Sequence, residues 1–280
     1  MFFFSLLKLL RPQQWSKNFF IFAGLIFAHK WGNLTLMSQA IIAFLAFSLA
    51  ASSIYIFNDW LDRVADRMHP LKKYRPFAAD TVNTISAFLL AGILALLGLG
   101  LGFILTPGVG WIVLIYIGLN IFYSAGLKYW IILDVFIIAA GFLLRVLAGT
   151  LGIGISASEW LLLCTLFLTL FLGFCKRTAE QRITDAQNRP ETYSADLLSK
   201  LLSITATGSV VSYILYTLHQ NTKFIYTVPL VLYGIFRYLY LLDKNSLPYV
   251  GIDIARDIKR DKQLLIVTVL WIVSIIFLGI

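Results

Sequence analysis

The chain has 280 residues, of which 59% are hydrophobic and 13% are charged, and its formal net charge is +9. Its mean hydropathy of +0.83 excludes a soluble globular protein. The basic residues border apolar segments instead of gathering on a soluble face, so the positive charge does not favour nucleic-acid binding.

Apolar segments of membrane-spanning length recur along the whole chain. No stretch between them is long and polar enough for a second soluble domain, so we expect one integral membrane domain over residues 1–280. The predicted fold class is all-α, a polytopic membrane protein with about nine transmembrane helices around a central cavity open to the cytoplasm. The expected helices are about 18–32, 36–57, 84–105, 109–125, 131–152, 159–175, 202–219, 223–242 and 263–280.

The distribution of charge predicts the orientation of these helices. If the N-terminus is cytoplasmic, 19 of the 23 lysines and arginines lie in inner loops, and only Lys30 and Lys223 lie in outer ones. This is the positive-inside pattern. Of the 14 acidic residues, Glu159 alone falls on the outer side. We therefore expect a cytoplasmic active site and an outward-facing C-terminus. The last inner loop, 243–262, is expected to be a solvated segment of mixed charge.

The densest group of polar residues lies at 58–66, where a long apolar segment ends. In a helix, Asn58, Asp62 and Asp66 would share one face, with Asp59 beside them. Hard oxygen ligands at this spacing suit Mg²⁺, which takes a carboxylate or two and fills its remaining positions with substrate phosphate and water. The alternative is a solvated loop in which these acids pair with neighbouring bases. Acids at a membrane mouth are costly and usually functional, which favours the metal site, with Asp59, Asp62 and Asp66 as catalytic residues.

Basic residues at the inner ends of the segments are candidates for binding phosphate oxygens. They are Lys17, Lys72, Lys73, Arg75, Lys128, Lys176 and Arg177. Lys128, which follows Tyr123, could equally serve only as a determinant of topology. The pair Lys176 and Arg177, close to Glu180, could equally be an interfacial cluster that binds lipid head groups.

Asp134 and Arg145 fall about three turns apart on one face of a single expected helix. A buried arginine in a membrane helix faces the bundle interior or a wet cavity. We expect both residues to line the cavity, and the alternative is a structural ion pair or a capped carbonyl.

Taken together, the motifs resemble the UbiA-type prenyltransferase superfamily, and within it the polyprenyl-phosphate (decaprenyl-phosphate) phosphoribosyltransferases. The resemblance covers the chain almost end to end. It rests on Arg11-Pro12-x-Gln14-Trp15-x-Lys17-Asn18, the residues from Asn58 to Asp66, His69-Pro70, Arg75-Pro76, Tyr123-Ser124-x-x-Leu127-Lys128, Leu133-Asp134-Val135, Arg145-x-x-Ala148-Gly149 and Lys176-Arg177-x-x-Glu180.

The resemblance implies a Mg²⁺-dependent transfer of 5-phosphoribose from phosphoribosyl diphosphate to a polyprenyl phosphate, in the inner membrane of a bacterium. Asn58 and the three aspartates would hold Mg²⁺ and diphosphate, and the other residues that bind substrate would be Lys17, Lys72, Lys73, Arg75, Tyr123, Lys128, Asp134, Arg145, Lys176, Arg177 and Glu180.

One departure separates this chain from prenyltransferases of the superfamily that act on aromatic acceptors. Those enzymes carry a second Asp-rich motif in the loop after the sixth helix, where this chain has Lys176-Arg177. A basic loop suits a donor with an additional phosphate. The alternatives are an ordinary prenyltransferase and, in another class, a transporter or binder of anionic lipid or solute.

Overall fold

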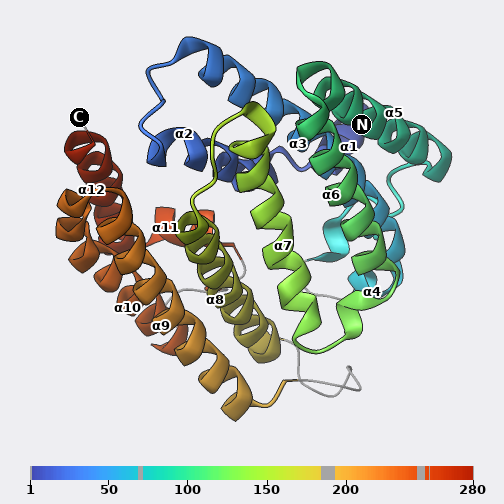
Figure 1. Cartoon of the computed structure of the whole chain (residues 1–280). Coiled ribbons are helices and arrows are strands. Elements are labelled where there is room, and N and C mark those ends of the chain that lie inside the picture. The colour runs from blue at the N-terminus through green and yellow to red at the C-terminus, as the bar shows by residue number, and fades with distance from the viewer. Residues whose placement is uncertain (1, 69–71, 184–192, 245–249, 252, 280) are drawn as a thin grey trace. The chain divides into compact units, whose positions relative to one another are not determined.

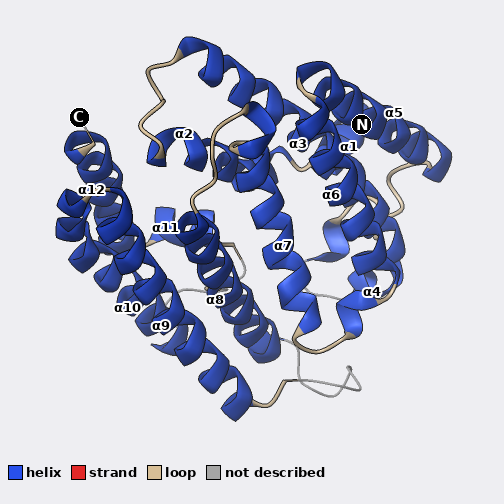
Figure 2. Ribbon diagram, viewed as in Figure 1, coloured by secondary structure: helices blue, strands red, loops and turns tan. Residues whose placement is uncertain are grey.

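The structure is a computed structural model, and it describes all residues except 1, 69–71, 184–192, 245–249, 252 and 280. His69 and Pro70 of the motifs above therefore lie outside the described residues. The described part of the chain is helical and contains no strand (Figure 2). Its α-helices, labelled in Figure 1, are α1 (Phe2–Leu10), α2 (Ala23–Phe27), α3 (Leu34–Leu61), α4 (Arg63–Met68), α5 (Thr84–Leu105), α6 (Pro107–Ala125), α7 (Leu133–Ala148), α8 (Glu159–Ile183), α9 (Ala195–Gln220), α10 (Val228–Lys244), α11 (Ile254–Arg260) and α12 (Lys262–Leu278).

The predicted all-α membrane fold is confirmed, but the count of nine spans is not. Within the described residues, seven helical segments are long and apolar enough to cross a membrane, or eight if α11 and α12, which meet at an angle of 107°, form one broken span. The expected first span at 18–32 is instead a 3₁₀-helix, η1 (Pro12–Phe22), followed by the short α2.

Close backbone packing accounts for this irregular first segment. A Cβ on Gly149 would lie 1.7 Å from the carbonyl oxygen of Ile21, and a Cβ on Gly24 would lie 2.4 Å from the carbonyl oxygen of Gly149. The backbone around residues 21–24 thus packs directly on the end of α7. Such an approach requires glycine at positions 24 and 149, because a Cβ at either would overlap a backbone oxygen.

The chain forms two compact units, residues 1–128 with 144–156, and residues 129–143 with 157–280. In the first unit, α3 packs along α5, and a Cβ on Gly98 would lie 2.8 Å from the carbonyl oxygen of Ala46. Asn33 begins α3, because its side chain accepts hydrogen bonds from the amides of Thr35 and Leu36. The helix is 28 residues long and contains no glycine or proline. Its last turn consists of residues 58–61.

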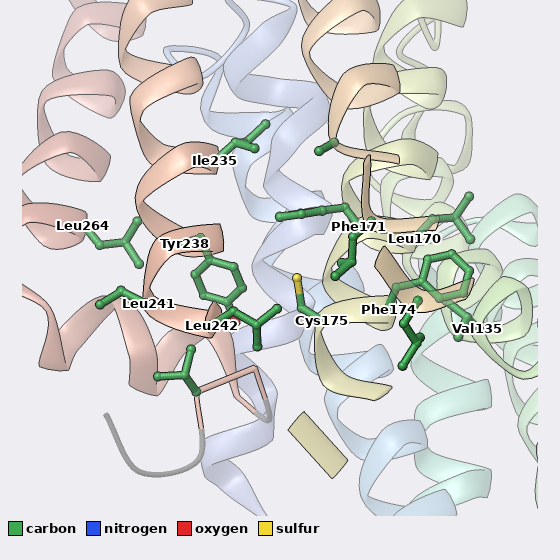
Figure 3. Packing of buried hydrophobic residues seen from close by; sticks show 14 of the residues in the cluster. Val135, Leu170, Phe171, Phe174, Cys175, Ile235, Tyr238, Leu241, Leu242 and Leu264 are labelled. Atoms are coloured by element: carbon green, nitrogen blue, oxygen red, sulfur yellow. The ribbon is translucent and has the colours of Figure 1, made fainter. Parts of the chain in front are cut away.

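In the second unit, α8 packs along α9, and its core includes residues of α7, α8 and α10. Figure 3 shows Phe171 and Cys175 of α8 facing Ile235 and Tyr238 of α10. The ring centroids of Phe171 and Tyr238 are 6.2 Å apart. The prediction of a single membrane domain over residues 1–280 stays a prediction.

The interpretation of 243–262 as a solvated loop is wrong for part of this segment. Asp257 is 1% exposed and accepts hydrogen bonds from the Tyr238 hydroxyl and the Gly251 amide, both at 2.9 Å. Asp261 is also buried, caps α12 and pairs with Arg237 at 2.7 Å. Each carboxylate has dedicated donors, which compensate the loss of hydration.

Candidate active site

The Asn58 motif lies where α3 ends and α4 begins, in the first unit. Asn58 and Asp59 occupy the last turn of α3, Asp62 caps it, and Asp66 lies in α4. The amide of Asp62 donates to the carbonyl of Asn58 at 2.9 Å, and the amide of Asp66 donates to that of Asp62 at 2.8 Å. Helical hydrogen bonding therefore continues through the junction, beyond residue 57, where the expected helix 36–57 was to end.

Two arginines converge on the buried carboxylates of this motif, Arg11 from 48 residues before Asp59 and Arg75 from nine residues after Asp66. Asp59 and Asp66 are 2% and 3% exposed. Arg11 forms an ion pair with Asp59, and Arg75 Nη1 lies 3.2 Å from Asp59 and 2.7 Å from Asp66. The guanidinium of Arg11 also lies 5.6 Å from the centre of the Tyr55 ring. The result is a compact group of alternating charges, two acids and two bases.

Arg11 belongs to a motif of the sequence analysis but had no assigned role there. Its backbone lies in the left-handed region with φ of 49°, directly before Pro12 and η1. This conformation is uncommon for a residue with a side chain. The sequence signal for a role of Arg11 was the Arg11-Pro12 pair. No local pattern could predict its contact with Asp59, 48 residues along the chain.

The other two members of the motif have partners on or just after α6. Lys128 Nζ lies 2.5 Å from Asp62 Oδ1, and the Ser124 hydroxyl donates to the side-chain oxygen of Asn58. The Asp62 side chain is 38% exposed, so this pair is accessible to solvent. The structure thus brings the predicted residues Asn58, Asp62 and Lys128 together with Ser124, which belongs to a motif of the sequence analysis but had no assigned role there.

The donor set of the motif fits a hard divalent cation in its chemistry. It comprises one amide oxygen and three carboxylates, and Asp59 Oδ2 is buried without a hydrogen-bond partner. Such an oxygen is costly unless a cation or donor reaches it. Among the described residues, however, no three acidic, histidine or cysteine side chains are arranged to hold a metal ion. The carboxylates face arginine and lysine instead, so a metal would compete with these bases for them.

A second charged cluster lies in the second unit, between the start of α7 and the end of α8. Arg177 Nε is 2.6 Å from Asp134 Oδ2, and Arg177 Nη1 is 2.5 Å from Glu180. Lys176 Nζ is 3.8 Å from the same glutamate. These four residues, all predicted as site residues, therefore form one network with equal numbers of acids and bases.

Tyr193 completes this second cluster and was not predicted. Its hydroxyl donates to Asp134 at 2.6 Å and accepts the amide of Ile132, also at 2.6 Å. Burial and the bond to Asp134 raise the pKa of Tyr193 well above its usual range, so the phenol stays protonated and remains a donor. Tyr193 lies 59 residues from Asp134 in a polar loop, where the sequence carries no signal for it.

Arg145 lies in a third place, at the other end of α7 from Asp134. It is 4% exposed, and its Nε donates to the Asn18 side chain at 2.7 Å while its Nη2 donates to the Tyr116 hydroxyl at 3.0 Å. Its guanidinium lies 4.7 Å from the centre of the Tyr116 ring. Asn18 in turn donates to Ser48 at 2.9 Å. Arg145 thus joins η1, α3 and α6 through neutral polar groups.

The remaining predicted residues lie on η1, on α6 and in a short segment before Arg75. Lys17 and Tyr123 are half-buried on η1 and α6. Lys72, half-buried, and Lys73, exposed, form the short 3₁₀-helix η2 (Lys72–Tyr74) that precedes Arg75. Lys73 Nζ lies 5.2 Å from the centre of the Tyr74 ring. Their assignment to substrate binding stays a prediction.

Comparison with known proteins identifies the family of the chain. The sequence profile of the UbiA prenyltransferase family matches residues 18–248. The chain belongs to the UbiA prenyltransferase family. Within this UbiA chain, the match begins at Asn18 and includes the Asn58 motif and the Lys176-Arg177 pair.

Two curated relatives of this UbiA-family chain are decaprenyl-phosphate phosphoribosyltransferases. That of Mycolicibacterium smegmatis is 36% identical over 226 residues, which are 78% of this chain and 71% of the relative. That of Corynebacterium glutamicum is 36% identical over 222 residues, or 76% of this chain and 67% of the relative.

Solved UbiA structures share the fold. A UbiA homologue from Archaeoglobus fulgidus bound to GPP and Mg²⁺ has a TM-score of 0.75 and 17% identity, and the match covers 98% of this chain and 99% of that one. A digeranylgeranylglyceryl phosphate synthase has a TM-score of 0.71, also at 17% identity, over 98% of this chain and 97% of the other.

Proposed function

We propose that the chain transfers 5-phosphoribose from 5-phosphoribosyl 1-diphosphate to a polyprenyl phosphate such as decaprenyl phosphate, with Mg²⁺ as cofactor. The bond between ribose C1 and a diphosphate oxygen breaks, and a bond between C1 and an oxygen of the lipid phosphate forms. Diphosphate leaves. The product would serve the synthesis of cell-envelope glycan precursors.

The choice of phosphoribosyl diphosphate as donor depends on one observation, the basic pair Lys176 and Arg177. It stands in the place where prenyltransferases with aromatic acceptors carry a second Asp-rich motif. Asp134 and Glu180 hold Arg177 at 2.6 and 2.5 Å, so its guanidinium has a defined position. Identities of 36% to two decaprenyl-phosphate phosphoribosyltransferases support the same donor.

Asn58, Asp59, Asp62 and Asp66 would hold Mg²⁺ in this reaction. Bound there, Mg²⁺ would neutralise charge that develops on the leaving diphosphate. Arg11 and Arg75, which already lie beside the carboxylates, would bind diphosphate oxygens and orient C1 of the ribose.

Further basic residues have proposed roles in holding the other phosphates. Lys72, Lys73, Lys176 and Arg177 would contact phosphate groups of the two substrates, with Asp134 and Glu180 positioning Arg177. Lys17, Lys128 and Arg145 would engage the lipid phosphate or the donor, near Tyr123. A lipid phosphate is already ionised at neutral pH, so the reaction needs no strong general base.

We further propose that the protein lies in the bacterial inner membrane with the N-terminus and the active site on the cytoplasmic side and the C-terminus outside. The support is the excess of lysine and arginine in the inner loops.

A donor competition tests the proposed function. Purified protein in detergent with Mg²⁺ is given labelled phosphoribosyl diphosphate and decaprenyl phosphate in one tube, and a prenyl diphosphate with 4-hydroxybenzoate in another. Labelled lipid in the first tube alone is the expected result. Product in the second tube alone would assign the chain to the prenyltransferases with aromatic acceptors and would contradict the role of Lys176 and Arg177.

A further inference from the structure

The second unit contains an apolar cavity of about 220 Å³ among α8, α9, α10, α11 and α12. Its walls include Leu168, Phe171 and Leu172 of α8, Ile235 of α10 and Trp271 of α12. A cavity of about 150 Å³ with such walls stays dry and binds benzene. By proportion this one holds about nine carbon atoms, or roughly two isoprene units.

The polar groups at the cavity wall are already satisfied within the protein. The Tyr213 hydroxyl is 2.6 Å from Thr227 Oγ1 and accepts the indole N–H of Trp271 at 2.9 Å. The Tyr238 hydroxyl donates to Asp257, and Ser209 donates to the carbonyl of Thr205. A water molecule needs two to four polar partners, which this wall does not offer. The cavity therefore suits hydrocarbon.

One wall of the cavity is fixed by a buried carboxylate. Ile254 and Ile258 of α11 line the cavity. Asp257, between them in sequence, is 1% exposed and is held by Tyr238 and by the amide of Gly251. These bonds tie α11 to α10, so the cavity is preformed, and an apolar space left empty would cost stability.

Helix α8, which forms part of the cavity wall, also carries the basic residue Lys176. Leu168, Leu172 and Lys176 follow one another at four-residue spacing on α8, so they lie along one side of the helix. The rise of the helix puts Lys176 about 6 Å beyond Leu172. A ligand with a negatively charged head and a hydrocarbon tail would match this sequence of an apolar wall followed by a base.

We propose that the cavity binds the first isoprene units of the acceptor's polyprenyl chain, with the lipid phosphate beside Lys176. This inference rests on the proposed function, because the acceptor is the amphipathic ligand that the proposed reaction requires. The cavity would then select acceptors by the part of the chain nearest the reacting phosphate.

Gly234 allows the cavity to be filled without disturbing the backbone. It lines the cavity, and a Cβ there would meet only Val267 Cγ1, at 3.9 Å. The matched control is Gly118 of α6, a half-buried glycine of a membrane-spanning helix with nothing within 4 Å of an added Cβ. Gly234→Leu would occupy the cavity, whereas Gly118 is not part of its wall.

The first test compares acceptors of different length, with labelled phosphoribosyl diphosphate as donor. Gly234→Leu should raise KM for decaprenyl phosphate at least about tenfold, since it displaces several buried methylenes. Its kcat for decaprenyl phosphate should stay at the wild-type value, and its KM for dimethylallyl phosphate, which carries the first isoprene unit alone, should rise as well. Gly118→Leu should behave as wild type. Wild-type KM for decaprenyl phosphate in Gly234→Leu would overturn the proposal.

The second test reads binding without activity. Decaprenyl phosphate with a diazirine in its second isoprene unit should label peptides of α8, α10 or α12 in wild type and Gly118→Leu but not in Gly234→Leu. Labelling of these peptides by a phospholipid with a diazirine in its acyl chain, and not by the polyprenyl probe, would overturn the proposal.

The two tests separate this proposal from the proposed function. Labelling by the polyprenyl probe without phosphoribosyl transfer would refute the reaction and leave the chain site standing. Transfer without labelling at the cavity would refute the chain site alone.

Discussion

Replacing Asp62 by asparagine separates a metal-binding role from a structural one. Among the three aspartates of the motif, Asp62 is the one whose side chain is accessible, at 38% exposed. Its ion pair with Lys128, at 2.5 Å, is partly solvated. An accessible pair of this kind contributes about 0–1 kcal/mol to folding. Asp62→Asn should therefore lower Tm by no more than about 4 °C.

The effect of Asp62→Asn on catalysis should be far larger than its effect on stability. Loss of a group that stabilises the charge of the leaving group costs about 100- to 1,000-fold in rate, or about 3–4 kcal/mol. The assay is transfer of labelled phosphoribose to decaprenyl phosphate at saturating donor, with Tm of the same preparation measured in detergent.

The matched control for this variant is Asp80→Asn. Asp80 also forms an exposed ion pair, with Arg67 at 2.7 Å, but it lies outside the Asn58 motif. Its replacement should change neither rate nor Tm beyond the error of the measurements. If Asp62→Asn retained activity within threefold of wild type, roughly 0.6 kcal/mol, at ordinary Mg²⁺, the assignment of this motif to Mg²⁺ would be refuted.

Three further predictions follow from single contacts. Tyr193→Phe removes the donor to Asp134 and the acceptor of a backbone amide, so unfolding in denaturant should be easier by about 1–3 kcal/mol; an unchanged midpoint would contradict the bonds described. Gly149→Ala places a methyl group 1.7 Å from a backbone oxygen and should abolish folded protein on size-exclusion chromatography, whereas Gly118→Ala should elute as wild type. Mg²⁺ and diphosphate together should raise Tm of wild type, by about 2.7 kcal/mol of stabilisation at 100 times Kd, and Arg75→Ala should lose most of this rise; equal rises in both would exclude Arg75 from diphosphate binding.

The membrane-helical class was predictable because it depends on composition. Backbone amides in a bilayer must be hydrogen-bonded without water, and an unbroken apolar stretch of about 20 residues achieves this within itself as an α-helix. The segment 18–32, which was expected to be the first spanning helix, does not form one. There the packing of residues 21–24 on the end of α7 determines the backbone, and helical propensity does not predict such a contact.

The Asn58 motif was predictable for a related reason. Its four residues lie within nine positions where α3 ends and α4 begins, so their distance in sequence alone keeps them near one another. Their grouping differs from the predicted face, because Asp66 shares Arg75 with Asp59, whereas Asn58 and Asp62 have partners on or just after α6. The partners of the motif were not predictable from local pattern. Arg11 and Arg75 come from other segments, and only the fold brings them to Asp59.

Asp134 and Arg145 show most clearly which features the sequence determines and which depend on tertiary structure. The sequence by itself determined that both lie on one helix within an all-α membrane fold. Tertiary structure alone decided their partners, which are Arg177 and Tyr193 for one and Asn18 and Tyr116 for the other. The physical reason is that helical periodicity sets which side chains share a face. The partner that compensates a buried charge is set by which segment packs against that face, 29 to 127 residues away.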